Sequence, residues 1–342
     1  MTDGRHRLAV LDGWRGISIL LVLGAHLLPL SPKSWRFNEM AGPMGMALFF
    51  TLSGFLITRF LLQHDSIVDF LIRRFFRIVP LAWLALLVTL PLVDAPASAY
   101  LPNFLFYANL PPYHLVDATA HFWSLCVEVQ FYATVALIVA VLGKRGLYLL
   151  IAICLAVTAH RVFAGAEIEI VTWHRVDEIL AGAILALIWS DQLGSRAPTV
   201  VSRANVYVLA VLYAISCHPA SGFANYLRPY LAAMLIGTTL YRPPELVGAV
   251  LRSRFLRYIA AISFALYVFH FLLVHTWLGE GDKLVRYLKR PLLFAATFLL
   301  AHVSTFQYEQ RWIDFGKRLS ARVRPHRHGS NRRSRRHRNR SR

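Results

Sequence analysis

Apolar runs of membrane-spanning length recur along the whole chain, separated by short polar segments. A helix needs about 20 mostly apolar residues to cross the hydrocarbon core of a bilayer. The pattern therefore predicts an all-α, polytopic membrane protein with about ten transmembrane helices. The predicted spans are residues 14–30, 43–62, 76–94, 122–142, 146–163, 174–190, 205–218, 228–241, 257–278 and 291–309. The segment 99–110 contains Pro102, and we expect it to lie on the membrane or re-enter it.

The positions of Lys and Arg in the short loops predict the orientation of these spans. Cytoplasmic loops carry an excess of basic residues, and most basic loops fall on one side when the N-terminus is placed inside. We therefore expect an inner (cytoplasmic) membrane protein with both termini in the cytoplasm. One loop, 279–290, disagrees, because it places basic residues on the outer side.

Charge is concentrated at the C-terminal end. The chain has a formal charge of +19, and residues 311–342 hold thirteen Lys or Arg and one acidic residue. We predict a membrane domain over residues 1–315 and a disordered cytoplasmic tail over residues 316–342 that is attracted to anionic lipid. The tail has no aromatic side chain for base stacking, so no nucleic-acid partner is expected. The three cysteines, Cys126, Cys154 and Cys217, form no metal motif, and no metal is expected.

Ionisable residues inside the first span are the strongest sign of function. Arg15 and His26 are eleven positions apart, which is about three helical turns or about 16 Å along one face. Ionisable groups in a spanning helix are functional candidates. Asp12 lies three residues before Arg15, and the two can pair at the start of the helix.

A second group of charges lies where the chain enters the third predicted span. Arg74 and Arg77 are three residues apart and share a helical face, with Arg73 beside them. Guanidinium groups bind phosphate oxygens in a bidentate manner. These arginines can therefore bind a phosphorylated ligand from the cytoplasm, or they can be no more than a topology signal.

Further polar groups interrupt the later apolar segments. Glu128 enters the fourth span and needs a cation, a proton or water. Arg175, Asp177 and Glu178 lie at the start of the sixth span, and His270 lies within the ninth. Interior salt bridges are the simpler explanation for this last group, and a substrate site is the alternative.

These residues resemble the membrane acyltransferase 3 family. LDGWRGISILLVLGAH resembles its opening, with Arg15 and His26 in the R-x10-H pattern. MGMALFFTLSGFLI, FLIRRFFRIVPLAW, HFWSLCVEVQFY, HRVDEILAGA and SFALYVFH resemble later blocks in the same order, over about residues 8–315. Val129 departs from the family pattern, in which many members have a second acid.

The resemblance implies a ten-helix enzyme that transfers an acyl group, often acetyl from acetyl-CoA, to a hydroxyl. The acceptor it implies is an extracytoplasmic glycan or lipid-linked saccharide, such as O-antigen, exopolysaccharide or peptidoglycan; some relatives acylate macrolides. Certain members carry an added esterase-like domain, and this chain resembles the stand-alone kind. Acetyl-CoA is expected as a co-substrate, with no tightly bound cofactor.

The residue patterns and the resemblance together predict a role for each site residue. His26 is the expected general base, oriented or neutralised by Glu128, and Arg15 faces the same vestibule as the phosphate-binding Arg74 and Arg77. Trp123 and Ser124 are candidate donors to the oxyanion. Direct transfer and a route through an acyl-His26 intermediate both fit.

Two other classes of function remain open. A proton-coupled transporter of a small solute also uses intramembrane His, Glu, Asp and Arg, but it often has inverted repeats, and none is visible here. The second class is a non-catalytic membrane protein that assists a glycan-assembly machine. Only the enzyme makes an acylated acceptor and releases CoA.

Overall fold

The computed structural model describes residues 2–323, with the side chains of residues 9–323, and this part of the chain is helical and without strands. The α-helices are α1 (Thr2–Leu27), α2 (Phe37–Gln63), α3 (Ile67–Leu92), α4 (Ala97–Phe104), α5 (Trp123–Leu142), α6 (Leu149–Ala164), α7 (Asp177–Trp189), α8 (Arg196–Arg203), α9 (Val206–Cys217), α10 (Arg228–Tyr241), α11 (Glu245–Leu251), α12 (Arg254–Val274), α13 (Lys283–Val303) and α14 (Gln310–Val323). A π-helical turn, Ser304–Glu309, joins α13 to α14.

Fewer helices have the length and apolarity of a membrane span than the sequence predicts. Five stretches qualify: Ala9–Leu27, Phe37–Gln63, Ile67–Leu92, Asp117–Ala164 and Arg254–Val274. The pair α8–α9, bent by 84°, would be a sixth if it counted as one span. The expected count of ten is therefore not confirmed, although the all-helical, apolar architecture is.

Two of the remaining predicted spans are short helices. Helices α7 and α10 have 13 and 14 residues, below the roughly 20 that a perpendicular span needs. Most of their residues are buried inside the protein. Their apolar composition therefore serves protein packing as well as any contact with lipid.

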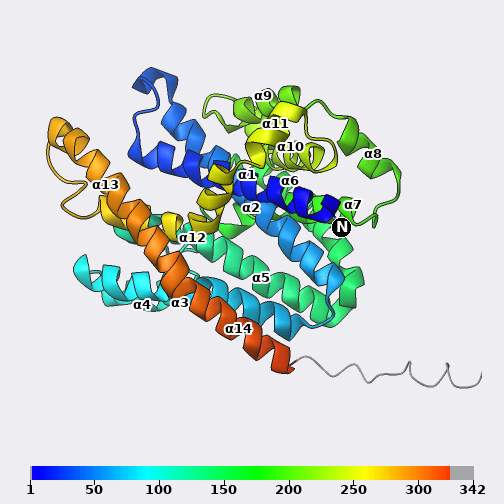
Figure 1. Cartoon of the computed structure of the whole chain (residues 1–342), viewed down its shortest axis with the longest axis horizontal. Helices are drawn as coiled ribbons and strands as arrows, with labels where there is room; N and C mark the ends of the chain where they lie inside the picture. Colours follow the sequence, from blue (N-terminus) through cyan, green and yellow to red (C-terminus); the bar gives the residue numbers. More distant parts are fainter. Residues whose placement is uncertain (1, 324–342) are drawn as a thin grey trace, which may run out of the picture.

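Helices α1 and α2 form the centre of the bundle. Helix α1 packs between α2 and α12, and α2 continues the row onto α7, which contacts α6 and α10. Helix α13 lies against α12, and α14 lies against α3. Figure 1 shows α13 and α14 as one long diagonal rod, from orange to red, that passes α12 and α3. Helix α1 therefore lies against α10, α11 and α12 from the C-terminal half of the chain as well as against α2.

Glycines bring α2 and α7 into backbone contact. A Cβ atom on Gly54 would lie 1.8 Å from the carbonyl oxygen of Ile179, and one on Gly182 would lie 2.0 Å from that of Thr51. Such distances leave no room for a side chain, and the opposing atoms are backbone atoms that cannot rotate away. The two glycines therefore set how closely these helices cross.

Gly54→Val is expected to destabilise the protein by at least about 1–3 kcal/mol, because α2 and α7 must separate to admit the side chain. Thermal unfolding of detergent-solubilised protein measures the effect as a lower Tm. Gly24→Ala in α1 is the control, since its Cβ would meet only the side chain of Leu30 at an ordinary 3.6 Å. Equal Tm values for the two variants would contradict the close-crossing explanation.

The C-terminal segment begins as an ordered helix. Residues 316–323, predicted from the sequence to lie in a disordered tail, belong to α14. Trp312 and Phe315 pack on Phe76 of α3, with ring centroids 6.0 and 5.1 Å apart. Gly316 meets the same aromatic side chain and gives α14 its close approach. The rest of the predicted lipid-binding tail, 324–342, lies outside the described residues.

Candidate functional site

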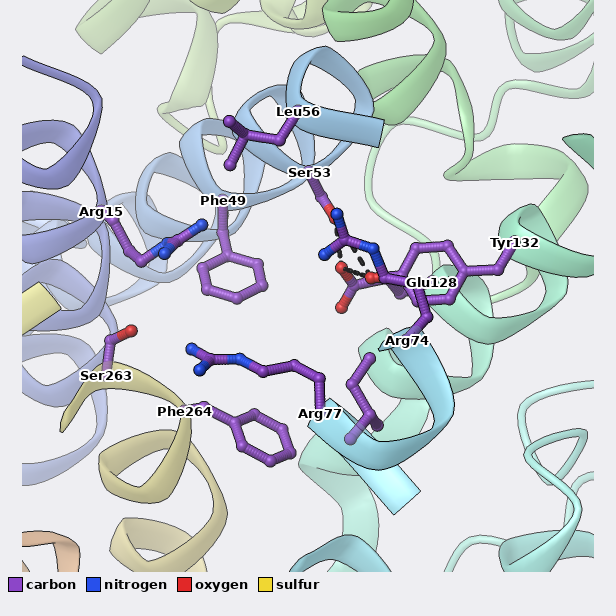
Figure 2. A pocket seen from close by; sticks show the side chains of 11 residues that line it. Arg15, Phe49, Ser53, Leu56, Arg74, Arg77, Glu128, Tyr132, Ser263 and Phe264 are labelled. Carbon is purple, nitrogen blue, oxygen red and sulfur yellow. Dashed lines mark hydrogen bonds between the residues drawn. The ribbon is translucent and has the colours of Figure 1, made fainter. Parts of the chain in front are cut away.

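Three arginines line one cavity between α1, α2, α3, α5 and α12, which we call the arginine pocket. Arg15 comes from α1, and Arg74 and Arg77 come from one face of α3. Figure 2 shows Arg15 and Arg77 extending toward each other from opposite sides, with Arg74 near Glu128. About 500 Å³ of empty space, part of it open to solvent, lies among these residues. The predicted convergence of these three cations is therefore observed in the structure.

A hydrogen-bonded carboxylate forms one wall of the arginine pocket. Ser53 Oγ and Tyr132 Oη both donate hydrogen bonds to Oε1 of Glu128, whose side chain is buried. Tyr132 follows Glu128 by one turn of α5, so the two share a helical face. The guanidinium carbon of Arg74 lies 5.9 Å from the centroid of the Tyr132 ring. Glu128 thus lines the arginine pocket and neither of the cavities that His26 lines, so its predicted place beside His26 was wrong.

The arginines of this pocket have free hydrogen-bonding capacity. None of the guanidinium groups of Arg15, Arg74 and Arg77 forms a hydrogen bond or salt bridge with another described residue. Glu128 is the only carboxylate among the lining residues, so the lining has three cations and one anion. Such a pocket is suited to an anionic ligand with several oxygen acceptors.

Two residues predicted for this group lie apart from it. Arg73 forms a salt bridge with Asp69, in which Nε and Oδ1 are 2.5 Å apart, and it does not line the pocket. Asp12 is half-buried on α1 and also does not line it. The pocket therefore contains Arg15, Arg74 and Arg77 without these two neighbours.

A pair of histidines lies toward the other end of α1. Nδ1 of His26 is 3.0 Å from Nε2 of His270 on α12, and the two rings stack with centroids 5.2 Å apart. Nδ1 of His270 is 2.7 Å from the carbonyl oxygen of Tyr267. These contacts join residues that are 244 positions apart in the sequence.

The hydrogen-bond network assigns the protons of this pair. A carbonyl oxygen only accepts, so Nδ1 of His270 carries hydrogen and its Nε2 is the acceptor when the ring is neutral. His26 then donates from Nδ1 to that acceptor. The lone pair of His26 Nε2 is left free to accept a proton from a ligand.

His26 is exposed where two cavities meet. The first, the apolar chamber, has about 1060 Å³ of empty space, and the second, the basic mouth, has about 870 Å³. Most residues of the chamber are apolar, whereas the mouth includes four cationic side chains. The chamber is lined by Val22, His26, Gly42, Pro43, Met46, Leu115, Ala120, His121, Trp123, Ile168, Glu169, Ile170, Arg175, Tyr267 and Phe271. The mouth is lined by His26, Leu27, Lys33, Val274, Leu278, Gly279, Lys283, Arg286, Tyr287, Arg290 and Leu293.

Arg175 supplies a buried cation to the apolar chamber. Its guanidinium carbon lies 5.3 Å from the centroid of the Trp123 ring, and both residues line the chamber. Nη1 of Arg175 is 3.4 Å from Oε1 of Glu178, but neither Nη1 nor Nε has a hydrogen-bond acceptor among the described residues. A buried donor without a partner is costly, so these atoms are available to a ligand.

Asp177 and Glu178 form buried ion pairs behind the chamber. Asp177 Oδ2 is 2.5 Å from Nη1 of Arg161, and Glu178 Oε1 is 2.7 Å from Nε of Arg228. All four side chains are at most 1% exposed. Neither acid lines the chamber, so their arrangement matches the interior salt bridges that were the simpler expectation.

One aromatic contact links the lining of the arginine pocket to that of the apolar chamber. Phe49 lines the pocket and Tyr267 lines the chamber, and their rings stack with centroids 6.5 Å apart. Tyr267 Oη donates to the carbonyl oxygen of His121 and lies 2.6 Å from Ser124 Oγ. The Ser124 hydroxyl therefore donates its hydrogen bond to Tyr267 Oη. This contact makes Ser124 less available as an oxyanion donor.

Several residues that line these cavities were not predicted from the sequence. His121 lines the chamber; its Nε2 is 3.2 Å from the carbonyl oxygen of Val268, and its buried Nδ1 has no described partner. Its place directly before Phe122-Trp123, in a block already singled out, was the available signal. Ser53 and Tyr132 had weaker signals, since only Tyr132 shares a helix with Glu128.

Comparison with known proteins gives one family and several curated relatives. The family described as "Acyltransferase domain" matches residues 8–306. The peptidoglycan O-acetyltransferase OatA of Listeria monocytogenes serovar 1/2a is 26% identical, covering 86% of this chain and 54% of that protein. The putative peptidoglycan O-acetyltransferase YrhL of Bacillus subtilis is 25% identical, covering 76% and 48%. Nodulation protein 10 of Rhizobium leguminosarum bv. viciae is 25% identical, covering 72% and 76%.

The chain spans about half the length of the two peptidoglycan O-acetyltransferases. No solved structure matches the chain significantly.

Proposed function

Because the chain belongs to the acyltransferase-domain family, we propose that it is an integral-membrane O-acyltransferase. It transfers an acyl group, acetyl in the first instance, from cytoplasmic acyl-CoA to a hydroxyl of an extracytoplasmic glycan or glycolipid. The observation that carries the proposal is the arrangement along α1, with a phosphate-compatible arginine pocket at Arg15 and an exposed imidazole at His26. The printed names of the OatA and YrhL relatives support acetyl transfer to a glycan.

The arginine pocket is the proposed binding site for the phosphates of acyl-CoA. Arg74 and Arg77 have free guanidinium groups, and phosphate oxygens are good bidentate acceptors for them. Glu128, held by Ser53 and Tyr132, gives Arg74 a fixed anionic neighbour. Arg15 and His26 are about 16 Å apart along α1, so the extended pantetheine arm carries the thioester from one to the other.

His26 is the proposed general base. Its Nε2 takes the proton of the acceptor hydroxyl while that oxygen attacks the thioester carbonyl carbon. The tetrahedral intermediate then collapses, the C–S bond breaks, and the CoA thiolate receives the proton from His26. His270 orients the imidazole through the 3.0 Å contact with Nδ1. Arg175, with donors that lack partners, is a better candidate than Ser124 to stabilise the oxyanion.

The orientation of the chain follows from these assignments. Acyl-CoA is a cytoplasmic metabolite, so the arginine pocket and both termini face the cytoplasm. The apolar chamber and the basic mouth then face the opposite side, where the half-buried indole of Trp123 offers an apolar surface to a sugar ring.

Transfer of label from acetyl-CoA tests the proposal. Membranes that contain the protein receive acetyl-labelled CoA, and label is then counted in glycan and lipid-linked fractions. An O-acetyltransferase gives alkali-labile label with one free CoA per acetyl transferred. Uptake or release of a solute with no labelled product would refute the enzyme in favour of a transporter.

Arg74→Ala is expected to raise the KM for acyl-CoA about 10- to 150-fold, because a hydrogen bond to a charged group contributes about 1.5–3 kcal/mol. Initial rates over a range of acyl-CoA concentrations measure the change. Arg74→Lys keeps the charge without the bidentate fork and is expected to fall between wild type and alanine.

Arg311→Ala is the matched control for this prediction. Arg311 is exposed on α14, the helix that packs on α3, and it does not line the pocket. The control is expected to keep the wild-type KM. If the Arg74 variant also kept it, the arginine pocket would not be the phosphate site.

A further inference from the structure

The basic mouth holds an unneutralised group of cations beside His26. Lys33, Lys283, Arg286 and Arg290 line it, and no Asp or Glu is among its lining residues. None of the four forms a salt bridge with another described residue. Like charges at one cavity repel one another, so the arrangement is stable only with solvent or an anion between them.

Helical spacing gathers these cations. Lys283, Arg286 and Arg290 lie in the first three turns of α13 at intervals of three and four residues, which places them on one face. Lys33, from the segment between α1 and α2, reaches the same cavity. The cluster is therefore built by two separate segments.

Two charged residues next to the mouth, Asp282 and Lys289, form hydrogen bonds outside it. Asp282 caps α13 by accepting a hydrogen bond from the amide of Val285, at 2.8 Å, and does not line the mouth. Lys289 bonds the carbonyl oxygens of Trp277 and Glu280, at 2.7 and 3.2 Å, and also lies outside the mouth. Neither Asp282 nor Glu280, the two acids of the 279–290 loop, is among the lining residues, so the lining of the mouth is positively charged.

One cation of the mouth is held in place before a ligand arrives. The guanidinium carbon of Arg290 lies 3.9 Å from the centroid of the Tyr287 ring, a close cation–π contact. Arginine stacked in this way keeps its edge donors free for a carboxylate or phosphate.

We propose that the basic mouth binds an anionic group of the acceptor, a carboxylate or a phosphate, and so positions a neighbouring hydroxyl at His26. The inference rests on the proposed O-acyltransferase function. It follows because His26 lines both the mouth and the apolar chamber. One acceptor molecule can therefore place its anion among the cations and its hydroxyl at the imidazole.

The test uses the full chain in phosphatidylcholine vesicles with acetyl-CoA and matched acceptors. One oligosaccharide carries a uronic acid, a second is its neutral methyl ester, and a third is a neutral saccharide on a lipid diphosphate. For wild type, the KM for an anionic acceptor is expected to be at least about tenfold lower than for the methyl ester. Preference for the uronic acid or for the lipid diphosphate identifies the source of the anion, and either supports the inference.

Arg286→Gln is expected to raise the KM for the preferred anionic acceptor by about tenfold or more, with the KM for acetyl-CoA and the rate on the methyl ester unchanged. Arg286→Lys is expected to retain part of the preference. Lys289→Gln, which removes a cation from the same helix outside the mouth, is expected to behave as wild type. Added salt should weaken binding of the anionic acceptor in wild type more than in Arg286→Gln.

The test distinguishes failure of the basic-mouth proposal from failure of the proposed acyltransferase function. Equal KM values for the acid, its ester and the lipid diphosphate, with His26-dependent transfer to all, would overturn the basic mouth and leave the acyltransferase intact. An equal effect of Arg286→Gln on charged and neutral acceptors would do the same. No transfer to any acceptor, with no CoA released, would refute the proposed function and the inference with it.

Discussion

His26→Ala is expected to reduce acyl transfer by about 10²–10⁴-fold, the usual contribution of a positioned general base. The substitution removes the only group at the junction of the chamber and the mouth to which we assign proton transfer. Binding of acyl-CoA should be nearly unchanged, because the arginine pocket is about three helical turns away. Labelled-acetyl transfer measures the rate, and equilibrium binding of CoA measures the donor site.

His275→Ala is the control for this substitution. His275 follows α12, bonds the carbonyl oxygen of Phe271 within its own turn, and lines neither cavity. It is expected to keep wild-type activity. A folded His26 variant with wild-type transfer would remove the imidazole from the mechanism, and label retained on wild-type protein after incubation with donor alone would indicate an acyl-His26 intermediate.

Glu178→Ala is expected to lower the free energy of unfolding by about 3–5 kcal/mol, the cost of breaking a buried ion pair by removing one partner. Arg228, which is fully buried, would lose its 2.7 Å contact, and Arg175 would lose the only ion pair that it forms with a described residue. Two buried guanidinium groups would then lose an ion-pair partner. Thermal unfolding in detergent should show a large fall in Tm, with reduced yield from membranes.

Glu39→Ala provides the comparison. Glu39 pairs with Arg36 at 2.5 Å, but the two side chains are 56% and 44% exposed. Solvent screens such a pair, so its loss should leave the Tm nearly unchanged. Similar Tm values for the Glu178 and Glu39 variants would mean that the buried network is not needed for the fold.

The sequence was sufficient to predict which site residues lie together where their spacing along one helix decides the geometry. Arg74 and Arg77 share a face of α3 because they are three residues apart, and their convergence with Arg15 was expected. Contacts between distant helices could not be derived in this way. The partner of His26 is His270, and the partners of Glu128 include Ser53 from another helix. Nothing in local spacing specifies which polar groups meet across a bundle.

The number of spans was predicted less well for a physical reason. Hydropathy is the same whether an apolar side chain faces lipid or protein. Helices α7 and α10 are apolar because they are buried beside α2, and their length is insufficient for a perpendicular span. The loop 279–290 disagreed with the charge rule for topology. It contains Lys283, Arg286 and Arg290, which are three of the four cations of the basic mouth. The exception to the topology rule therefore coincides with the cations of the proposed anion site.

The stacked rings of Phe49 and Tyr267 have a consequence for cell energetics. If the arginine pocket opens to the cytoplasm and the chamber opens outward, these two rings are a narrow barrier between compartments at different electrochemical potential. Water and protons that passed them would dissipate the proton-motive force, whereas the proposed mechanism requires a thioester to reach His26. The same aromatic contact must therefore yield to a slender acyl chain and still insulate the membrane, so the permeability of the resting protein limits how wide its substrate passage can become.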